Sequence, residues 1–380
     1  MVFRMRINDN RRTQTMARVY NFSAGPSMLP EKVLKTAQAD LLDYKGSGQS
    51  VMEMSHRSKW FEEIIADTEA TMRRVLGVPD NYKIGFFQGG ATQQFAMVPL
   101  NFMTTGHADY LVTGNFSKKA AEEAAKFGRA DIVASSKDKN FTYIPDVKAI
   151  AYTPDASYVH ICQNNTIFGT RYAEVPQVDG VPLVADMSSM IFSEPTDVSR
   201  YGCIYFGVQK NVAPAGMAVA IIRDDLLGKS AAGITPDKIP TMMNYTTLLA
   251  QDSMYNTPPC WCIYMTGLVM AYLEKDIGGL AEMQKINTAK ANVLYSYLDS
   301  QGFYKNPVEH KYRSMMNVTF TSPNADLDKA FCAAAAKAGF LNLKGHRLVG
   351  GMRASIYNAM PAEGIDRLVA FMENFRKENQ

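Results

Sequence analysis

The sequence of 380 residues predicts an α/β protein, with a mostly parallel sheet in a large domain and a smaller α+β domain at the C-terminal end. Short apolar runs alternate with amphipathic helical stretches along most of the chain, which is typical of parallel sheets covered by helices. The chain is 47% hydrophobic and longer than one typical domain. Near Pro258 the alternation gives way to longer helical stretches. We therefore expect a second domain after this point.

The first part of the chain contains the apolar runs that predict the sheet. Residues 20–26 have turn chemistry, and Pro30 opens a helix that begins at Glu31. Short continuous apolar runs are typical of strands that are buried on both faces. We expect such strands at 83–87, 110–112, 158–162, 181–185, 203–206 and 217–222, and a helix at 118–127.

The C-terminal part predicts a different arrangement. Helical stretches at 264–273 and 280–298 flank the pair Gly278-Gly279. A strand at 316–320, helices at 327–338 and 363–376, and a glycine-rich loop at 345–351 follow. We expect a large domain at residues 19–278, including the N-terminal segment, and a small domain at 279–380.

Residues 1–18 contain five arginines and one acidic residue, Asp9. This composition has some similarity to a mitochondrial presequence, but the segment lacks serine and a clear apolar face. We expect a disordered basic tail, or an upstream start with Met16 as the true beginning.

Composition excludes several classes of function. The net charge of +3 is too small to indicate a nucleic-acid partner, and no apolar run is long enough to span a bilayer. The five cysteines are odd in number and irregularly spaced, which favours a reducing, cytoplasmic compartment and no metal site. The chain contains neither a P-loop nor the third glycine of a dinucleotide fingerprint.

Two residues at strand ends predict the chemistry. Lys210 follows one apolar run, and a lysine whose pKa is depressed is suited to a Schiff base with a carbonyl cofactor. Asp186 ends the preceding run, at the edge where open α/β sheets bind ligands. Pyridoxal phosphate needs such a carboxylate at its ring nitrogen. Each residue alone also fits an ordinary role, as a solvated lysine or a helix N-cap.

A glycine turn and an aromatic residue add to this hypothesis. The segment Gln88-Gly89-Gly90 lies between a strand and a helix, where backbone N–H groups can approach a phosphate. Phe116 follows another strand and could stack on an aromatic ring. The turn could equally be an ordinary connection, and Phe116 could belong to the core.

A set of cationic residues could bind an anionic substrate. His56, Arg57, His346, Arg347 and Arg353 lie in two polar segments. Arginine binds carboxylate or phosphate through paired hydrogen bonds, although a single arginine is more often a solvated surface residue.

Together these motifs resemble the phosphoserine aminotransferases, a family of fold-type I, class V pyridoxal phosphate-dependent aminotransferases. The resemblance runs from about Val19 to the C-terminus, and the last motif is the most diagnostic. The motifs are 21–26 (NFSAGP), 55–57 (SHR), 88–90 (QGG), 256–259 (NTPP) and 345–358 (GHRLVGGMRASIYN).

The resemblance implies roles for individual residues. Lys210 would bind the cofactor and transfer the proton, and Asp186 would pair with the pyridine nitrogen. Arg353 would hold the α-carboxylate, and His56, Arg57, His346 and Arg347 would form the pocket for the substrate phosphate or side-chain carboxylate, partly across a dimer interface. The other cofactor contacts would come from Ala91, Thr92, Phe116, Thr166 and Gln209, and from Asn256 and Thr257 of the second subunit.

The reaction that the resemblance implies is transfer of an amino group from L-glutamate to 3-phosphohydroxypyruvate by a homodimer. This reaction belongs to serine biosynthesis, and a role in pyridoxine biosynthesis is a second expectation. Two positions depart from the family pattern. Phe116 stands where a tryptophan is usual, and Ala91 stands where a third glycine is common. Both substitutions keep the interactions that the cofactor needs. Phe116 still offers an aromatic face, and Ala91 is still a small residue with a backbone N–H donor.

Other functions stay open from sequence alone. A related class V aminotransferase would act on another small anionic oxo-acid, and a cysteine desulfurase would need a nucleophilic cysteine on a mobile loop. A nicotinamide dehydrogenase would need the missing glycine fingerprint. A catalytically inactive binding protein would not need both Lys210 and Asp186.

Overall fold

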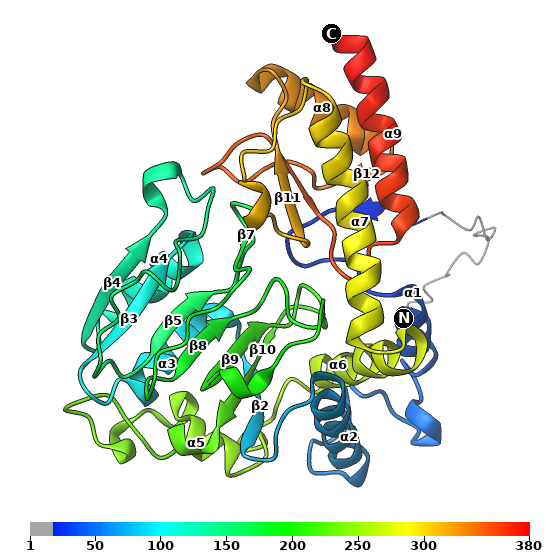
Figure 1. Cartoon of the computed structure of the whole chain (residues 1–380). Coiled ribbons are helices and arrows are strands. Elements are labelled where there is room, and N and C mark those ends of the chain that lie inside the picture. The colour runs from blue at the N-terminus through cyan, green and yellow to red at the C-terminus, as the bar shows by residue number, and fades with distance from the viewer. Residues whose placement is uncertain (1–17) are drawn as a thin grey trace, which may run out of the picture.

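The computed structural model describes residues 18–380, so the predicted basic tail lies outside the described residues except for Arg18. A seven-stranded sheet forms the centre of the larger, lower part of the molecule (Figure 1). Five neighbouring strands run parallel, and β10 runs antiparallel to both of its neighbours. The predicted mostly parallel sheet is therefore confirmed. Its order is β2 (Tyr82–Gln88), β10 (Met217–Arg223), β9 (Cys203–Gly207), β8 (Leu183–Asp186), β5 (Val159–Cys162), β3 (His107–Val112) and β4 (Arg129–Ser135).

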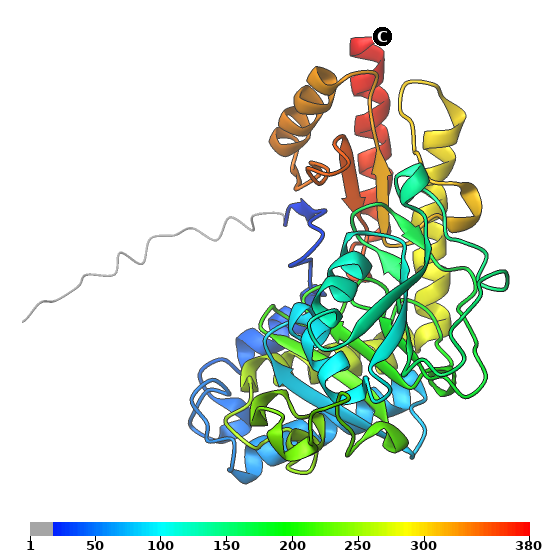
Figure 2. The same cartoon turned by 90° about the vertical axis from the view of Figure 1, so that its left-hand side faces the viewer.

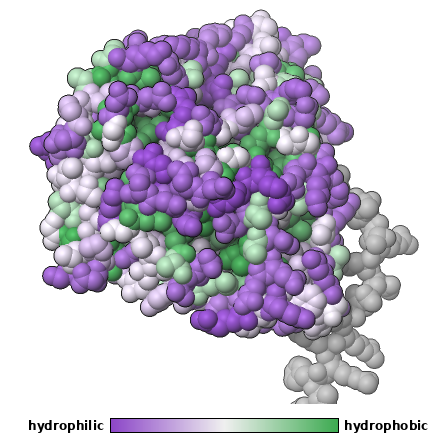
Figure 3. Space-filling view, turned by 60° about the horizontal axis from the view of Figure 1, so that its bottom comes forward, coloured by the Kyte–Doolittle hydropathy of each residue, from purple (hydrophilic) through white to green (hydrophobic). Residues whose placement is uncertain are grey.

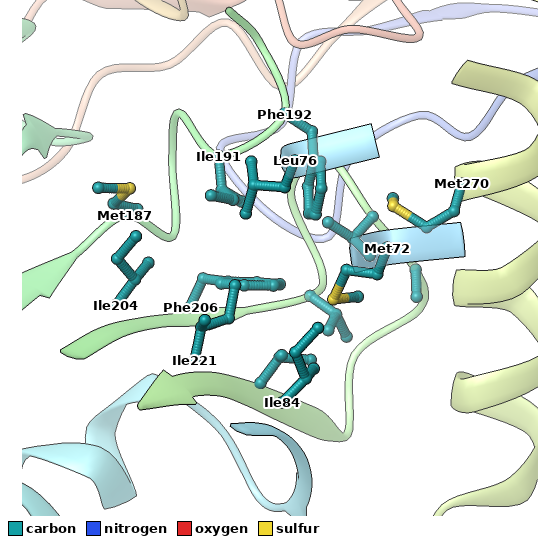
Figure 4. Packing of buried hydrophobic residues seen from close by; sticks show 14 of the residues in the cluster. Met72, Leu76, Ile84, Met187, Ile191, Phe192, Ile204, Phe206, Ile221 and Met270 are labelled. Atoms are coloured by element: carbon teal, nitrogen blue, oxygen red, sulfur yellow. The ribbon is translucent and has the colours of Figure 1, made fainter. Parts of the chain in front are cut away.

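Helices cover both faces of this sheet because its strands are apolar on both sides. One face packs against α3 (Ala91–Phe102), α4 (Asn115–Ala124) and α5 (Tyr245–Leu249). The other face packs against α2 (Lys59–Leu76) and α6 (Cys260–Tyr272), which also contact each other. Figure 4 shows part of this second core, where side chains of β9 and β10 meet those of α2 and α6.

The smaller part of the molecule lies above the sheet and ends in the C-terminal helix (Figures 1 and 2). Its strands β11 and β13 pair antiparallel, and its helices enclose a separate apolar core. Its elements are α7 (Leu280–Ser300), β11 (Asn317–Phe320), α8 (Ala325–Lys337), β12 (Phe340–Leu341), β13 (Met352–Ser355) and α9 (Ala362–Asn379).

The start of the described chain joins this smaller part. Strand β1 (Tyr20–Asn21) pairs parallel with β12, and Phe22 is buried in the C-terminal core. Helix α1 (Glu31–Ala39) then contacts α6. We propose to keep the domain boundary near Gly278-Gly279 and to assign β1 to the small domain, because its pairing and burial are there.

Most expected elements are present with shifted ends. The helix expected at 118–127 begins earlier, at Asn115, because Ser117 Oγ accepts hydrogen bonds from the backbone N–H groups of Thr113 and Gly114 at the helix start. Helix α2 and strands β4 and β13 were not among the expected elements, nor was the short hairpin of β6 (Asn164–Asn165) and β7 (Thr170–Arg171). No described helix is long and apolar enough to cross a membrane. Figure 3 shows one face of the molecule, on which apolar patches lie among hydrophilic side chains.

Candidate active site

The site lies where the carboxyl ends of the parallel strands meet the small domain. Both Asp186, the last residue of β8, and Lys210, three residues after β9, line one cavity of about 310 Å³. Parallel strands place their carboxyl ends at the same edge of a sheet, which brings residues from separate strands together. The cavity contains nine of the fourteen site residues predicted from the sequence: Ala91, Thr92, Phe116, Thr166, Asp186, Gln209, Lys210, His346 and Arg353.

Lys210 is buried, and its amine has a defined position. Its Nζ donates a hydrogen bond to Thr166 Oγ1 at 2.8 Å and lies 5.5 Å from the centre of the Phe116 ring. Burial lowers the pKa of Lys210, and the nearby Asp186 carboxylate opposes this shift. A lowered pKa increases the neutral fraction of the amine near pH 7. Lys210 is therefore suited to act as a nucleophile and a base.

Asp186 is held in place by its own loop. Its Oδ1 accepts hydrogen bonds from the backbone N–H of Ser188 at 2.9 Å and from Ser188 Oγ at 2.6 Å. Ser188 Oγ in turn accepts from the N–H of Gly207 at the end of β9. Burial raises the pKa of Asp186, while Lys210 and Ser188 oppose this shift. A cationic ring nitrogen in the cavity would stabilise the carboxylate by supplying the opposite charge.

The glycine turn opens helix α3 toward the same cavity. Gly89 has a φ of 97°, which favours glycine, and Gly90 is the N-cap of α3. Gly90, Ala91, Thr92 and Gln209 all line the cavity. The N-terminal N–H groups of a helix and its dipole together attract a phosphate.

Arg353 brings a positive charge from β13 to the cavity. Its Nη1 donates to the carbonyl oxygen of Thr166 at 3.1 Å, so Thr166 contacts both Arg353 and Lys210. His346 also lines the cavity, and its pKa is lowered by burial and then by the charges of Arg353, Arg347 and Lys119. A carboxylate that binds here would meet a guanidinium, which forms paired hydrogen bonds with such groups.

Five predicted site residues do not line the cavity within one chain. Asn256 Nδ2 donates to Gln88 Oε1 at 3.3 Å, and Gln88 Nε2 donates to the carbonyl oxygen of Thr257 at 2.6 Å. Arg57 and Arg347 are exposed, and His56 is half-buried. Asn256 and Thr257 are thus hydrogen-bonded to Gln88, the last residue of β2, within their own chain. Their action on a second subunit remains a prediction.

The sequence predictions missed several cavity residues. Ser188 fixes Asp186, and its position two residues after an aspartate is the signal of an Asx turn that could have revealed it. Gly25 lies so close that a Cβ would be 3.4 Å from the side chains of Gln209 and Lys210. The remaining cavity residues outside the prediction are Ala24, Phe95, Cys162, Asn164, Ile167 and Ser189, whereas Gly90 belongs to the predicted glycine turn.

These residues fit pyridoxal phosphate. The cavity supplies a buried lysine for its aldehyde, a buried carboxylate for its ring nitrogen, an aromatic face at Phe116 and a helix N-terminus for its phosphate. Among the described residues, no group of three or more His, Cys, Asp or Glu side chains could hold a metal ion.

Comparisons with known proteins agree with this chemistry. The sequence model described as Aminotransferase class-V matches residues 19–368. A phosphoserine aminotransferase from Desulfatibacillum aliphaticivorans is 51% identical over 364 residues, which cover 95% of this chain and 99% of that protein. A phosphoserine aminotransferase from Bacillus cereus is 49% identical, with 96% of this chain and 100% of that protein covered.

Solved structures show the same relationship. Phosphoserine aminotransferase from Bacillus circulans subsp. alkalophilus superimposes with a TM-score of 0.92 at 43% identity, covering 96% of this chain and 99% of that chain. The pyridoxal phosphate-bound phosphoserine aminotransferase from Trichomonas vaginalis gives a TM-score of 0.88 at 37% identity, covering 94% and 100%. The chain therefore belongs to the class-V aminotransferases, a pyridoxal phosphate-dependent family, and within them to the phosphoserine aminotransferases.

Proposed function

We propose that this protein catalyses the ping-pong transfer of an amino group from L-glutamate to 3-phosphohydroxypyruvate, giving O-phospho-L-serine and 2-oxoglutarate. The observation that carries this proposal is the shared cavity of Lys210, Asp186 and Arg353. This cavity provides an amine, an anion and a cation. The chain is also about 50% identical in sequence to phosphoserine aminotransferases. The reaction would serve serine biosynthesis, with pyridoxine biosynthesis as a second expectation.

The roles of the residues follow from their positions. When bound, pyridoxal phosphate supplies an aldehyde that combines with amines and a ring that takes up the electron pair of the breaking Cα–H bond. Lys210 Nζ would accept the Cα proton of the amino acid and return it to the former aldehyde carbon of the cofactor, a role that the lowering of its pKa by burial favours. In the structure, Thr166 Oγ1 accepts a hydrogen bond from that amine and so fixes its position in the cavity. The Asp186 carboxylate, which lines the same cavity, would accept a hydrogen bond from the ring N–H of the bound cofactor.

Substrate orientation depends on the cations. Arg353 would bind the α-carboxylate, which is common to glutamate and phosphoserine. His346 lines the cavity beside Arg353, and the charges of Arg353 and Arg347 contribute to lowering its pKa, so a neutral imidazole and nearby guanidinium groups would offer hydrogen-bond donors to the second anionic end of the substrate. Arginine and histidine donors suit both a phosphate and a carboxylate, which lets one pocket accept both substrates.

A homodimer with shared sites is part of this proposal. His56, Arg57, Asn256 and Thr257 match the motifs of the family but do not line the cavity of their own chain. Exposed apolar residues near two of these motifs, Met52 and Tyr255, are 58% and 47% exposed in the single chain. Association of two copies would bury such residues and could bring the four motif residues to the partner's cavity. We also place the protein in the cytoplasm, which the odd number and irregular spacing of its cysteines support.

Among the alternative functions, the structure bears most directly on a cysteine desulfurase. Cys162 lines the cavity, but it belongs to β5, and burial raises the pKa of its thiol. A buried protonated thiol is a poor nucleophile. Another class V aminotransferase that acts on a small anionic oxo-acid remains the second candidate.

The test is product formation by the purified holoenzyme. With glutamate and 3-phosphohydroxypyruvate, the protein should form phosphoserine and 2-oxoglutarate in equal amounts, and the Lys210→Ala variant should form neither. Formation of 2-oxoglutarate with another oxo-acid but not with 3-phosphohydroxypyruvate would favour the second candidate.

A further inference from the structure

A strained loop follows Asp186 and carries the first feature of this inference. Phe192 has a φ of 61°, in the left-handed region that bulky residues rarely adopt, and it is fully buried. Its ring packs edge-on against Phe206 of β9 at 5.8 Å, and Figure 4 shows Ile191 and Phe192 at the edge of the core. Such a conformation persists only where surrounding contacts over-determine it.

Three asparagine side chains provide these contacts. Asn211 Nδ2 donates to the carbonyl oxygen of Ile191 at 3.0 Å, and Asn358 Nδ2 donates to that of Phe192 at 2.8 Å. Asn287 Nδ2 donates to the carbonyl oxygen of Ser193 at 3.0 Å. Three consecutive carbonyl groups are therefore each bound by a side-chain amide from a different segment of the chain.

The three asparagines also bind one another, and Asn358 is the central member. The backbone N–H of Asn358 donates to Asn211 Oδ1 at 3.0 Å, and Asn358 Oδ1 accepts from Asn287 Nδ2 at 2.9 Å. Asn211 and Asn287 are buried and Asn358 is half-buried, so these bonds are partly shielded from water. The donors of all three amides are paired, although Asn287 Oδ1 has no partner, and a buried amide donor is costly to leave unpaired.

A buried lysine holds the chain on both sides of Asn358. Lys290 lies one helical turn after Asn287 on α7, and its Nζ donates to the carbonyl oxygens of Ile356, Tyr357 and Met360 at 3.2, 2.8 and 3.1 Å. All three ammonium protons therefore have acceptors. Helix α7 thus fixes the segment after β13 through two side chains.

This network joins the segments that carry the reactive groups. Asn211 is the residue after Lys210, and Asn358 follows the strand β13 that carries Arg353. The bound carbonyls belong to the loop that begins at Asp186. On the cavity side, Thr166 contacts both Lys210 and Arg353. The amide network is a second connection between the segments of the same two groups, made by residues that do not line the cavity.

We propose that Asn358 is a positioning residue for transamination, which locks the Arg353 strand onto the Asp186 loop and the Lys210 segment. This inference rests on the proposed function, because it assigns the purpose of the lock to an aminotransferase site. Without the Asn358 amide, the carbonyl of Phe192 is unpaired and the left-handed loop is free to relax. Arg353 then shifts relative to Lys210, and a displacement of about 1 Å can reduce catalysis by roughly 100-fold.

The experiment compares Asn358→Ala and Asn358→Asp with a matched control. The aspartate variant keeps the shape of the side chain but removes the donor to Phe192, so it remains informative if the alanine variant does not fold. Asn379→Ala is the control, because Asn379 Nδ2 also donates to a backbone carbonyl, that of Phe375 at 2.8 Å, but this hydrogen bond lies within helix α9. The readouts are single-turnover release of 2-oxoglutarate from glutamate and amide hydrogen exchange of residues 187–193.

In both Asn358 variants, the glutamate concentration that gives half of the maximal rate should rise by about tenfold or more. Amide hydrogen exchange of residues 187–193 should also be faster than in the wild type. The control should stay within about twofold in both readouts. The inference is overturned if the Asn358 variants keep wild-type exchange and saturation, or if Asn379→Ala changes both readouts equally. Hydrogen exchange needs no substrate, so it tests the lock independently. A wild-type enzyme that reacts with glutamate but not with 3-phosphohydroxypyruvate would contradict the proposed function alone.

Discussion

Lys210 and Asp186 show how burial prepares two residues for one reaction. Burial disfavours the charged form of each, so the pKa of the lysine falls and that of the aspartate rises. Both types and their strand-end positions could be predicted from the sequence, since each follows an apolar run at the edge where open α/β sheets bind ligands, and the pair is more informative than either residue alone. Ser188 and the double contact of Thr166 could not be fully predicted, because they depend on how three strand ends are spaced in the fold.

The cofactor should attach to Lys210 and to no other lysine. Borohydride reduction of the holoenzyme followed by peptide mapping should place the label on Lys210, because its amine faces the cavity. Lys290 is the informative comparison, since it is also buried but its amine is bound by three carbonyl groups. A label on Lys290 or on a surface lysine would refute the assignment.

Arg353→Ala should weaken every amino-acid substrate, including alanine. Loss of a buried charge-assisted contact typically costs about 2–4 kcal/mol, or roughly 30- to 1,000-fold in kcat/KM. The absorbance of the bound cofactor should stay unchanged, because Lys210 and Asp186 remain. Steady-state kinetics with glutamate and alanine measure the effect, and Arg367→Ala on the outer face of α9 serves as the control. A loss confined to one substrate would place Arg353 at the side-chain pocket instead.

At the scale of the elements, the sequence predicts the buried strands well and their arrangement only partly. Helix α2 was not expected, although Ser58 caps its start and Gly77 ends it in the left-handed conformation. An apolar run has no direction, so β10 was not distinguished from its parallel neighbours. The short connection at 208–216 was the available signal, because a parallel crossover needs a dozen or more residues. The order of the strands depends on long-range packing that no local pattern contains.

Strand β5 carries a buried histidine that should make the fold sensitive to acid. His160 Nε2 lies 2.8 Å from Tyr205 Oη on β9, and burial lowers the pKa of His160 from 6.5 to about 3. Below pH 6.5 the unfolded chain binds a proton at this histidine while the folded chain does not. The free energy of unfolding should therefore fall as pH falls from about 6.5 toward 3, by up to about 1.4 kcal/mol per pH unit from this group.

Denaturant unfolding between pH 7 and pH 4 tests this expectation with two variants. His160→Gln should show a shallower loss of stability toward acid than wild type. His310→Gln should keep the wild-type slope, because His310 is exposed. Equal slopes for wild type and His160→Gln would show that His160 is protonated in the fold.

At the scale of the whole molecule, the single chain contains most but not all of the predicted site. Two explanations account for the five predicted site residues that do not line the cavity. Either a partner subunit supplies some of them to the site, or these residues have other roles. Sequence motifs identify which residues belong together, but they do not say in which copy of the chain each acts. Mixing two inactive variants separates these explanations.

Lys210→Ala and Asn256→Ala chains should each have little activity alone, and their mixture should recover activity. In a heterodimer, the site with intact Lys210 would receive intact Asn256 from the other chain. With random exchange, half of the dimers are mixed and one of their two sites is complete, so about a quarter of wild-type activity should return. Absence of recovery, with subunit exchange confirmed, would show that Asn256 acts within its own chain.

The most direct test of the whole account is the ratio of kcat/KM for O-phospho-L-serine to that for L-alanine, with 2-oxoglutarate as acceptor. Both amino acids offer the same α-carboxylate to Arg353, so only the phosphate distinguishes them. If the remaining cations form a phosphate pocket, one or more charge-assisted contacts should favour phosphoserine by at least about 30-fold. Equal efficiency with alanine would contradict the account, because the cavity would then bind amino acids without recognising a second anionic group.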